Sequence, residues 1–190
     1  MSSTAGVPVH EVRLTRAACP ACGDTGHGRP VADLGKGTVH LSLSHSDGYS
    51  ALLLSREHPV GLDIERVRPM PVATLAPATL CADERSYVFD EPPGDRRSMA
   101  YLRCWTRKEA VLKAVGTGVV GDLTLLEVSP REEVARVLHG TGEGPSDWHV
   151  SNLGPLPGLL AAVARPAGAD RAVVVREAGA DLTGPLVPMA

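Results

Sequence analysis

Three carboxylate residues, spread over two short motifs, are suited to hold a divalent cation. The first motif is Gly61-Leu62-Asp63-Ile64-Glu65, in which apolar and polar residues alternate as in a strand with one buried face. Asp63 and Glu65 therefore point to the same side. The second motif, Trp105–Ala110, favours helix and contains Glu109. Because Mg²⁺ prefers a few carboxylates plus substrate phosphates, the three acids predict a metal site for phosphate chemistry.

The helical motif also supplies cations. Trp105, Glu109 and Lys113 share one side of the expected helix, and Lys108 lies beside Glu109. Each part has a plain structural reading: acids on an open strand face are usually solvated, and a Glu–Lys pair one turn apart contributes only about 0.2–0.5 kcal/mol. The metal hypothesis depends on the combination of the motifs in one chain.

A third motif is a strand that ends in polar residues. Apolar and small polar residues alternate through 39–46, followed by an Asp-Gly turn signal. Its apolar residues, including Leu43, are expected to face a core, with Ser42 and Ser44 on the opposite side. His45 would then lie near the strand end, where its imidazole can reach an anion.

The order of these motifs resembles the 4′-phosphopantetheinyl transferases of the Sfp type, in particular the branch whose helix motif reads W-x-x-K-E-A. The resemblance covers residues 28 to 175. It implies an α+β fold, a pseudo-dimer of two similar α+β halves with the active site in the cleft between them. The matching segments are Gly28-Arg29-Pro30, Leu43–Ser46, Gly61–Glu65, Leu80–Glu84, Trp105–Ala110 with Lys113, and Gly116–Gly118.

The resemblance also implies an activity: Mg²⁺-dependent transfer of the phosphopantetheine group of coenzyme A to a serine of an apo acyl or peptidyl carrier protein, releasing adenosine 3′,5′-bisphosphate. In the family, Glu109 would take the serine proton either directly or through a metal-bound water. The implied site residues are the metal ligands Asp63, Glu65 and Glu109, the coenzyme A contacts Arg29, Ser44, His45, Lys108 and Lys113, and the catalytic residues Glu109 and Lys113.

Two alternatives stay open. One is the short holo-carrier-protein synthase type, a trimer of small chains; the Leu-Ser-His-Ser strand and Trp105 favour the Sfp type, and so a monomer. The other is a non-catalytic carrier-protein or coenzyme A binder with the same fold. The family normally has a longer region before Gly28, so we expect either weaker binding of the nucleotide end of coenzyme A here or compensation from another loop.

Composition narrows the class of protein. The net charge of −3 argues against a general nucleic-acid binder. No apolar run of about 18 residues and no leader is visible, so we expect a cytoplasmic protein without membrane contact. Cys19-Pro-Ala-Cys22 resembles half a zinc ribbon with His27 nearby, but a structural zinc needs four ligands. Because Cys81 and Cys104 are far away, reduced thiols are the expectation.

Because carrier proteins are acidic, the resemblance predicts a basic or apolar docking surface. Arg66, Arg68 and the loop Met70–Leu80 are the candidates. The alternatives are that the two arginines are ordinary surface charges and that the apolar residues of the loop belong to a core.

The expected domains are an N-terminal half (1–57), shorter than usual for the family, a C-terminal half (58–177) with the metal and helix motifs, and a flexible tail (178–190). We expect a short helix in the proline-interrupted loop after residue 69 and a hairpin loop at 140–146. Hydrophobic patterning further predicts helices at 82–88 and 95–115, and strands at 9–16, 38–45, 49–55, 60–65, 122–128, 147–152, 158–165 and 171–176.

Overall fold

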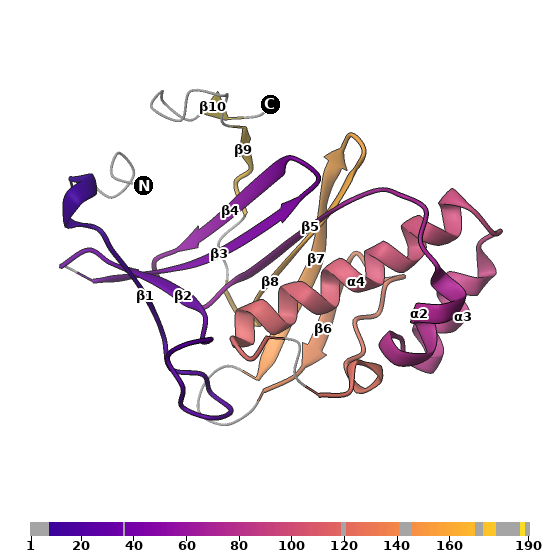
Figure 1. Ribbon diagram of the computed structural model, residues 1–190, viewed down its shortest axis with the longest axis horizontal. Coiled ribbons are helices and arrows are strands. Elements are labelled where there is room, and N and C mark those ends of the chain that lie inside the picture. Colours follow the sequence, from indigo (N-terminus) through magenta and orange to yellow (C-terminus); the bar gives the residue numbers. More distant parts are fainter. Residues whose placement is uncertain are drawn as a thin grey trace.

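A computed structural model describes residues 8–35, 37–118, 121–140, 146–169, 173–177 and 187–188. Within these residues, two four-stranded antiparallel sheets and three α-helices form the body of the molecule (Figure 1). The expected α+β class is confirmed. None of the helices in this part of the chain has the length and apolar character needed to cross a membrane.

The N-terminal sheet follows chain order, β1-β2-β3-β4, after a short 3₁₀ turn. Asp47 (φ 44°) and Gly48 (φ 83°) close the predicted β3–β4 hairpin with left-handed backbone, as such turns require. No α-helix accompanies this sheet in the described residues, so the expectation of two similar α+β halves is not confirmed. The strands are β1 (Arg13–Arg16), β2 (Pro30–Asp33), β3 (Thr38–Ser46) and β4 (Tyr49–Ser55).

The C-terminal sheet has the order β5-β8-β7-β6 and packs against the long helix α4 (Asp95–Val115). Small residues on the helix, among them Ala110 and Ala114, let it lie close to the sheet, and Trp148 fills the core beside it. The strands are β5 (Gly61–Arg66), β6 (Val134–Leu138), β7 (Asp147–Leu156) and β8 (Leu159–Pro166).

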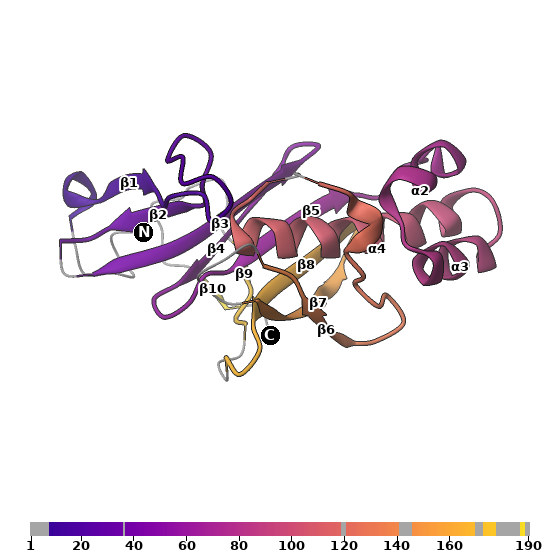
Figure 2. The ribbon, with the colours of Figure 1, turned by 90° about the horizontal axis from the view of Figure 1, so that it is seen from below.

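Two short helices, α2 (Val72–Thr79) and α3 (Ala82–Asp90), lie together at the N-terminal end of α4 (Figure 2). Val72 is buried in the core they share with α4, and Met70 and Leu75 are partly buried against it. The apolar residues expected either to dock a partner or to form a core therefore belong to the core.

Several predicted elements are confirmed and others are wrong. The short helix after residue 69 and the helices at 82–88 and 95–115 match α2, α3 and α4. Residues 122–128 hold the 3₁₀ turn η2 (Leu123–Leu125) instead of a strand, because a buried lysine takes the carbonyl groups of Leu123 and Leu126. The strands β2 and β6 were not predicted.

Near the C-terminus, only part of the predicted strand 171–176 is present. The strand β9 (Arg176–Glu177) pairs with β10 (Val187–Pro188), while 173–175 are not in a strand. Residues 171–172, the center of the expected loop at 140–146 (141–145) and, apart from β10, the expected flexible tail lie outside the described residues. The predicted boundary at residue 57 falls between β4 and β5 and stays a prediction.

Only part of the expected core face of β3 is buried. Val39 and Leu41 are buried in a core as expected, but Leu43 is 56% exposed, and Ser42 and Ser44 on the opposite face are also buried. These serines point toward β5 and are covered by it, so the polar side of β3 forms the junction between the two sheets.

Candidate active site

Serine side chains of β3 join the two sheets. β5 is the outer strand of its sheet, so the backbone N–H groups on its free side need acceptors. Alternate serines on β3 provide them, at the spacing of the strand pleat. The Oγ atoms of Ser42, Ser44 and Ser46 accept from the N–H groups of Leu62 (2.9 Å), Ile64 (3.2 Å) and Arg66 (3.0 Å).

Asp63 is the buried center of this junction. Its Oδ1 accepts from Ser44 Oγ at 2.8 Å and from Lys113 Nζ at 2.7 Å. Its Oδ2 is buried and has no hydrogen-bond partner. Burial raises the pKa of Asp63 and the charge of Glu65 adds to this, while Lys113 and Ser44 act in the opposite direction.

A glycine lets α4 bring its side chains to this point. A Cβ atom at Gly61 would lie 1.8 Å from the Ala110 carbonyl oxygen and 2.6 Å from the Ala114 nitrogen. The backbones of β5 and α4 therefore approach more closely than any side chain would allow. Lys113, one turn beyond Glu109, reaches Asp63 as a consequence.

Glu109 is partly buried on the same side of α4. Burial raises the pKa of its carboxyl; the charge of Asp63 and, more weakly, that of Glu65 raise it further, against an opposing effect of Lys113. The three acids therefore interact electrostatically. In the described part of the chain, their oxygen atoms are nevertheless not all within 4.8 Å of one another.

Glu65 accounts for part of that separation. Its Oε2 accepts from Ser46 Oγ at 3.0 Å and from Arg68 at 2.6 Å. Glu65 is thus held at the outer end of β5, where it borders an open hollow. The lining of that hollow is His45, Ser46, Asp47, Glu65, Arg66, Val67, Arg68 and Pro69.

Arg29 and the nearby His40 form a cationic corner at the C-terminal end of α4. Arg29 Nη1 donates to the Val115 carbonyl at 3.3 Å, and its buried Nε has no hydrogen-bond partner. Burial lowers the pKa of His40, and the nearby charges of Arg29 and His58 lower it further. This half-buried corner is electrostatically suited to an anion. Sequence analysis missed His40, although it shares the β3 face of Ser42 and Ser44.

The structure separates Lys108 from these residues. Its Nζ lies 2.7 Å from Glu84 Oε2, both side chains are almost fully buried, and the carbonyls of Leu123 and Leu126 accept its other protons. The assignment of Lys108 to coenzyme A does not fit this geometry, because its ammonium faces away from solvent and is fully hydrogen-bonded. The side chains of Ser44 and His45 also lie apart, because neighbouring residues point to opposite faces of β3.

Arg107 has a structural role that the sequence did not reveal. It is fully buried and donates to Asn152 Oδ1 at 2.7 Å and to the carbonyl oxygens of Ser129 (2.8 Å) and Glu132 (2.7 Å). Within the motif Trp105–Ala110, two residues thus hold neighbouring loops, and Glu109 alone of the charged ones faces Asp63.

Comparison with known proteins agrees with this arrangement. The family model described as the 4′-phosphopantetheinyl transferase superfamily matches residues 59–164, from the strand of Asp63 to the end of the C-terminal sheet. That is more than half of the chain of 190 residues.

Individual relatives carry the same description. The 4′-phosphopantetheinyl transferase AcpT of Salmonella typhi is 41% identical over 90 residues, which are 47% of this chain and 46% of that protein. For psf-1 of Bacillus pumilus the identity is 26% over 151 residues, 79% of this chain and 63% of that protein. For HetI of a Nostoc species it is 27% over 79 residues, 42% and 33% of the two chains.

The chain spans about half the length of the curated relatives it matches. The family match nevertheless contains both carboxylate motifs, the glycine that seats α4, and Lys113. On this match, the chain belongs to the 4′-phosphopantetheinyl transferase superfamily.

Proposed function

We propose that this chain transfers the 4′-phosphopantetheine group of coenzyme A to a serine of an apo acyl or peptidyl carrier protein. Membership of the superfamily supports the reaction class. The observation that carries the proposal is the meeting of Asp63, Glu109 and Lys113 where α4 crosses β5. Two interacting acids and a partly exposed ammonium group are what a phosphoryl-transfer site needs.

We propose Asp63, Glu65 and Glu109 as the ligands of a Mg²⁺ ion. The donor set fits a hard cation: Asp63 Oδ2 is buried and unpartnered, Glu65 raises the pKa of Asp63, and both of these acids raise the pKa of Glu109, a repulsion that a cation removes. Glu65 would exchange Arg68 for the ion. When bound, Mg²⁺ supplies charge neutralisation on the pyrophosphate oxygens.

The protein's own residues then have distinct roles. The carrier serine oxygen forms a bond to the phosphorus of the phosphopantetheine group, the bond from that phosphorus to the bridging oxygen breaks, and adenosine 3′,5′-bisphosphate leaves. Glu109 is our candidate for accepting the serine proton, either directly or through a water molecule. Lys113, with its side chain 29% exposed, stabilises the charge that develops on the pyrophosphate.

The coenzyme contacts divide between two places. Arg29, with its unpartnered Nε, is our candidate for the nucleotide phosphates. Ser44 is buried and acts on the reaction by orienting Asp63. His45 lines the hollow beside Glu65, from which its imidazole can contact an anionic group. In this proposal the active site occupies the cleft between the two halves, along β3 and β5.

We place the carrier protein at the same hollow, with Arg66 and Arg68 against its acidic surface. Arg68 also holds Glu65, so Arg66 gives the cleaner test. An Arg66→Glu variant should raise the apparent KM for the carrier and leave that for coenzyme A unchanged, whereas Arg13→Glu on β1 should change neither. An equal effect of Arg66→Glu on both substrates would contradict the docking site.

The reaction itself is tested by intact mass spectrometry of an apo carrier protein incubated with the full chain, coenzyme A and Mg²⁺. We expect the carrier to gain one phosphopantetheine group, with no gain in EDTA or with Glu109→Gln. Glu127→Gln, which changes an exposed carboxylate outside the site, is the matched control.

Absence of transfer to several unrelated carriers would contradict the enzymatic proposal. A calorimetric titration with coenzyme A would then show whether the chain is a non-catalytic binder. We further propose that the chain acts as a monomer, which size-exclusion chromatography tests: a trimer would instead support the short synthase type.

A further inference from the structure

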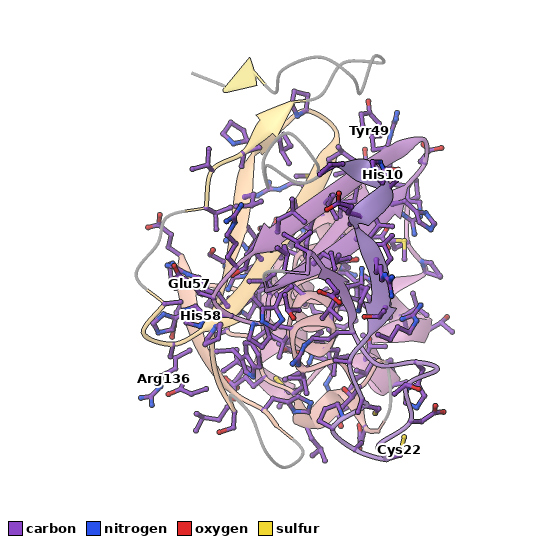
Figure 3. All side chains as sticks on the ribbon, turned by 90° about the vertical axis from the view of Figure 1, so that its left-hand side faces the viewer. His10, Cys22, Tyr49, Glu57, His58 and Arg136 are labelled. Atoms are coloured by element: carbon purple, nitrogen blue, oxygen red, sulfur yellow. The ribbon has the colours of Figure 1, made fainter. Side chains whose placement is uncertain are left out.

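The connection between β1 and β2 gathers two thiols and an imidazole. The Sγ atoms of Cys19 and Cys22 and a ring nitrogen of His27 all lie within 4.8 Å of one another. Cys22 Sγ is 3.2 Å from His27 Nε2. Both cysteines are free thiols; Cys19 is buried, and Figure 3 shows Cys22 with its sulfur at the edge of the molecule. Cys19 therefore forms a buried inner side of the cluster, and Cys22 forms an outer side that is exposed to solvent.

The distances within the cluster of Cys19, Cys22 and His27 suit one tetrahedral ion. With Zn–S bonds of about 2.3 Å and Zn–N bonds of about 2.05 Å, a tetrahedral site places sulfur and nitrogen about 3.6 Å apart and two sulfurs about 3.8 Å apart. The observed separation of Cys22 and His27 is 0.4 Å shorter than that first value, since 3.6 Å less 3.2 Å is 0.4 Å. Small side-chain rotations are enough to admit a metal ion.

The loop backbone holds the ligands in this arrangement. The N–H of Gly23 donates to the Cys19 carbonyl and the N–H of Cys19 donates to the Asp24 carbonyl, both at 2.8 Å. Gly23 has a φ of 75°, which only glycine adopts readily, and this turns the chain back toward Cys19. Asp24 Oδ1 accepts from the N–H of Gly26 at 2.7 Å and so shapes the approach to His27.

An acidic side chain of the same loop lies close to the cluster: Asp24 Oδ2 is 3.8 Å from His27 Nε2. Two sulfurs, one imidazole and an open fourth position match the ligand preference of Zn²⁺ over Mg²⁺ or Ca²⁺.

We propose that Cys19, Cys22 and His27 bind a zinc ion whose fourth ligand is Asp24 or a water molecule. The four cysteines are free thiols, as expected. The proposed site does not need Cys81 or Cys104, because its fourth ligand is a water molecule or Asp24. It lies apart from the carboxylates of α4 and β5 and does not depend on the proposed transfer reaction.

The zinc loop leads directly into the cationic corner at the end of α4. At its base, the N–H of Ala17 donates to the Arg29 carbonyl at 2.9 Å. A Cβ atom at Gly28 would lie 1.8 Å from the Ala17 carbonyl oxygen, so the two ends of this loop are in backbone contact. Arg29 in turn reaches Val115. An ion that clamps residues 19–27 thus fixes the segment that carries Arg29 against α4.

Zinc content is the first test. The full chain, purified in reductant without chelator, should contain one zinc per chain by plasma mass spectrometry. Cys22→Ser and His27→Ala should lose it. Cys81→Ser, which changes a thiol outside the loop and keeps a good helix N-cap residue, should retain it.

Cobalt substitution tests the ligands in the unaltered protein and does not depend on the folding of a variant. Co²⁺ should produce a thiolate charge-transfer band and the strong visible bands of a tetrahedral site, and Zn²⁺ should abolish both. A chain that contains no zinc and gives no such bands would overturn the proposal. So would zinc retained equally in Cys22→Ser and His27→Ala, or a Cys19–Cys22 disulfide in the metal-free protein.

Discussion

The ammonium group of Lys108 lies 2.7 Å from the carboxylate of Glu84, and both side chains are sealed from solvent. Glu84 completes the network: its Oε1 accepts from the N–H of Val128, and its Oε2 accepts from the N–H of Cys81 at the start of α3. This pair ties α3, α4 and the loop before β6 together. Lys108 therefore has a structural role. Lys113, five positions further along the same helix, instead contacts Asp63.

Removing either partner of this pair should mainly cost stability. An unpaired buried charge is expensive, so Lys108→Met and Glu84→Leu should each lower the free energy of unfolding by about 3–5 kcal/mol, and the double variant by less than the sum. Lys113→Met should cost less stability in urea unfolding than Lys108→Met, because the Lys113 ammonium is partly exposed, but it should strongly reduce transfer. If Lys108→Met were fully stable yet inactive, the structural role of Lys108 would be refuted.

Gly61→Ala should displace α4 from the sheet. The added methyl group would overlap the Ala110 carbonyl oxygen and the Ala114 nitrogen, and backbone cannot move aside as a flexible side chain can. Overpacking of this kind costs about 1–3 kcal/mol or more. Urea unfolding should show the loss, and coenzyme A binding by calorimetry should weaken because Glu109 and Lys113 move with the helix.

The matched control is Gly26→Ala, where the nearest atoms belong to the Asp24 side chain, at 3.2 Å and beyond. It should leave coenzyme A binding unchanged. An unchanged stability of Gly61→Ala would contradict the close contact between α4 and β5.

Patterns local in the sequence were predictable, and contacts between distant segments were not. The periodicity of residues 95–115 and the Asp47-Gly48 turn specified α4 and the β3–β4 hairpin. Alternation along β3 predicted the burial of Val39 and Leu41 but not that of the serine face, because serine is unusual as a junction between sheets and its partners are the backbone of β5. Likewise, nothing in the order Lys108-Glu109 indicates which of the two meets solvent.

The strand errors have a similar cause. Residues 122–128 have the composition of a strand, but carbonyl groups of this segment are claimed by Lys108 and its Val128 amide by Glu84. Such a competition arises only after α4 has packed. For the zinc site, the separation of Cys19 and Cys22 from His27 was visible in sequence, whereas the turn at Gly23 that brings the three together was not.

Ser44→Ala should affect both the sheet junction and the site. It leaves the N–H of Ile64 and one bond to Asp63 unsatisfied in a buried place, which costs about 1–3 kcal/mol in the free energy of unfolding. Without this hydrogen bond Asp63 should also hold its proton to higher pH, because Ser44 helps to lower its pKa. The variant should then need a higher Mg²⁺ concentration to reach the same rate of transfer.

Ser42→Ala is the control, since Ser42 accepts from the N–H of Leu62 on the same strand and its hydroxyl donates to the Leu62 carbonyl instead of to a carboxylate. It should match the loss of stability of Ser44→Ala and leave the Mg²⁺ dependence unchanged. If both variants shifted that dependence equally, the effect would come from the sheet junction and not from Asp63.

His40 should make the free energy of unfolding depend on pH. Burial, and then the charges of Arg29 and His58, lower the pKa of His40 below its model-peptide value of 6.5. Between that lowered pKa and 6.5, the unfolded chain binds a proton that the folded chain does not, so stability rises with pH in this window and is lost as pH falls through it. His40→Asn should reduce this slope in urea unfolding between about pH 7 and pH 5.

Two other histidines help to interpret the pH dependence of the free energy of unfolding. Burial also lowers the pKa of His139, so part of the slope should remain in His40→Asn. His10 is highly exposed, and His10→Asn should leave the slope as it is. Nuclear magnetic resonance titration of the His40 ring gives the pKa directly: a value at or above 6.5 would contradict the positive corner formed with Arg29 and His58. A coenzyme phosphate bound at Arg29 should raise that pKa, because the anion stabilises the imidazolium.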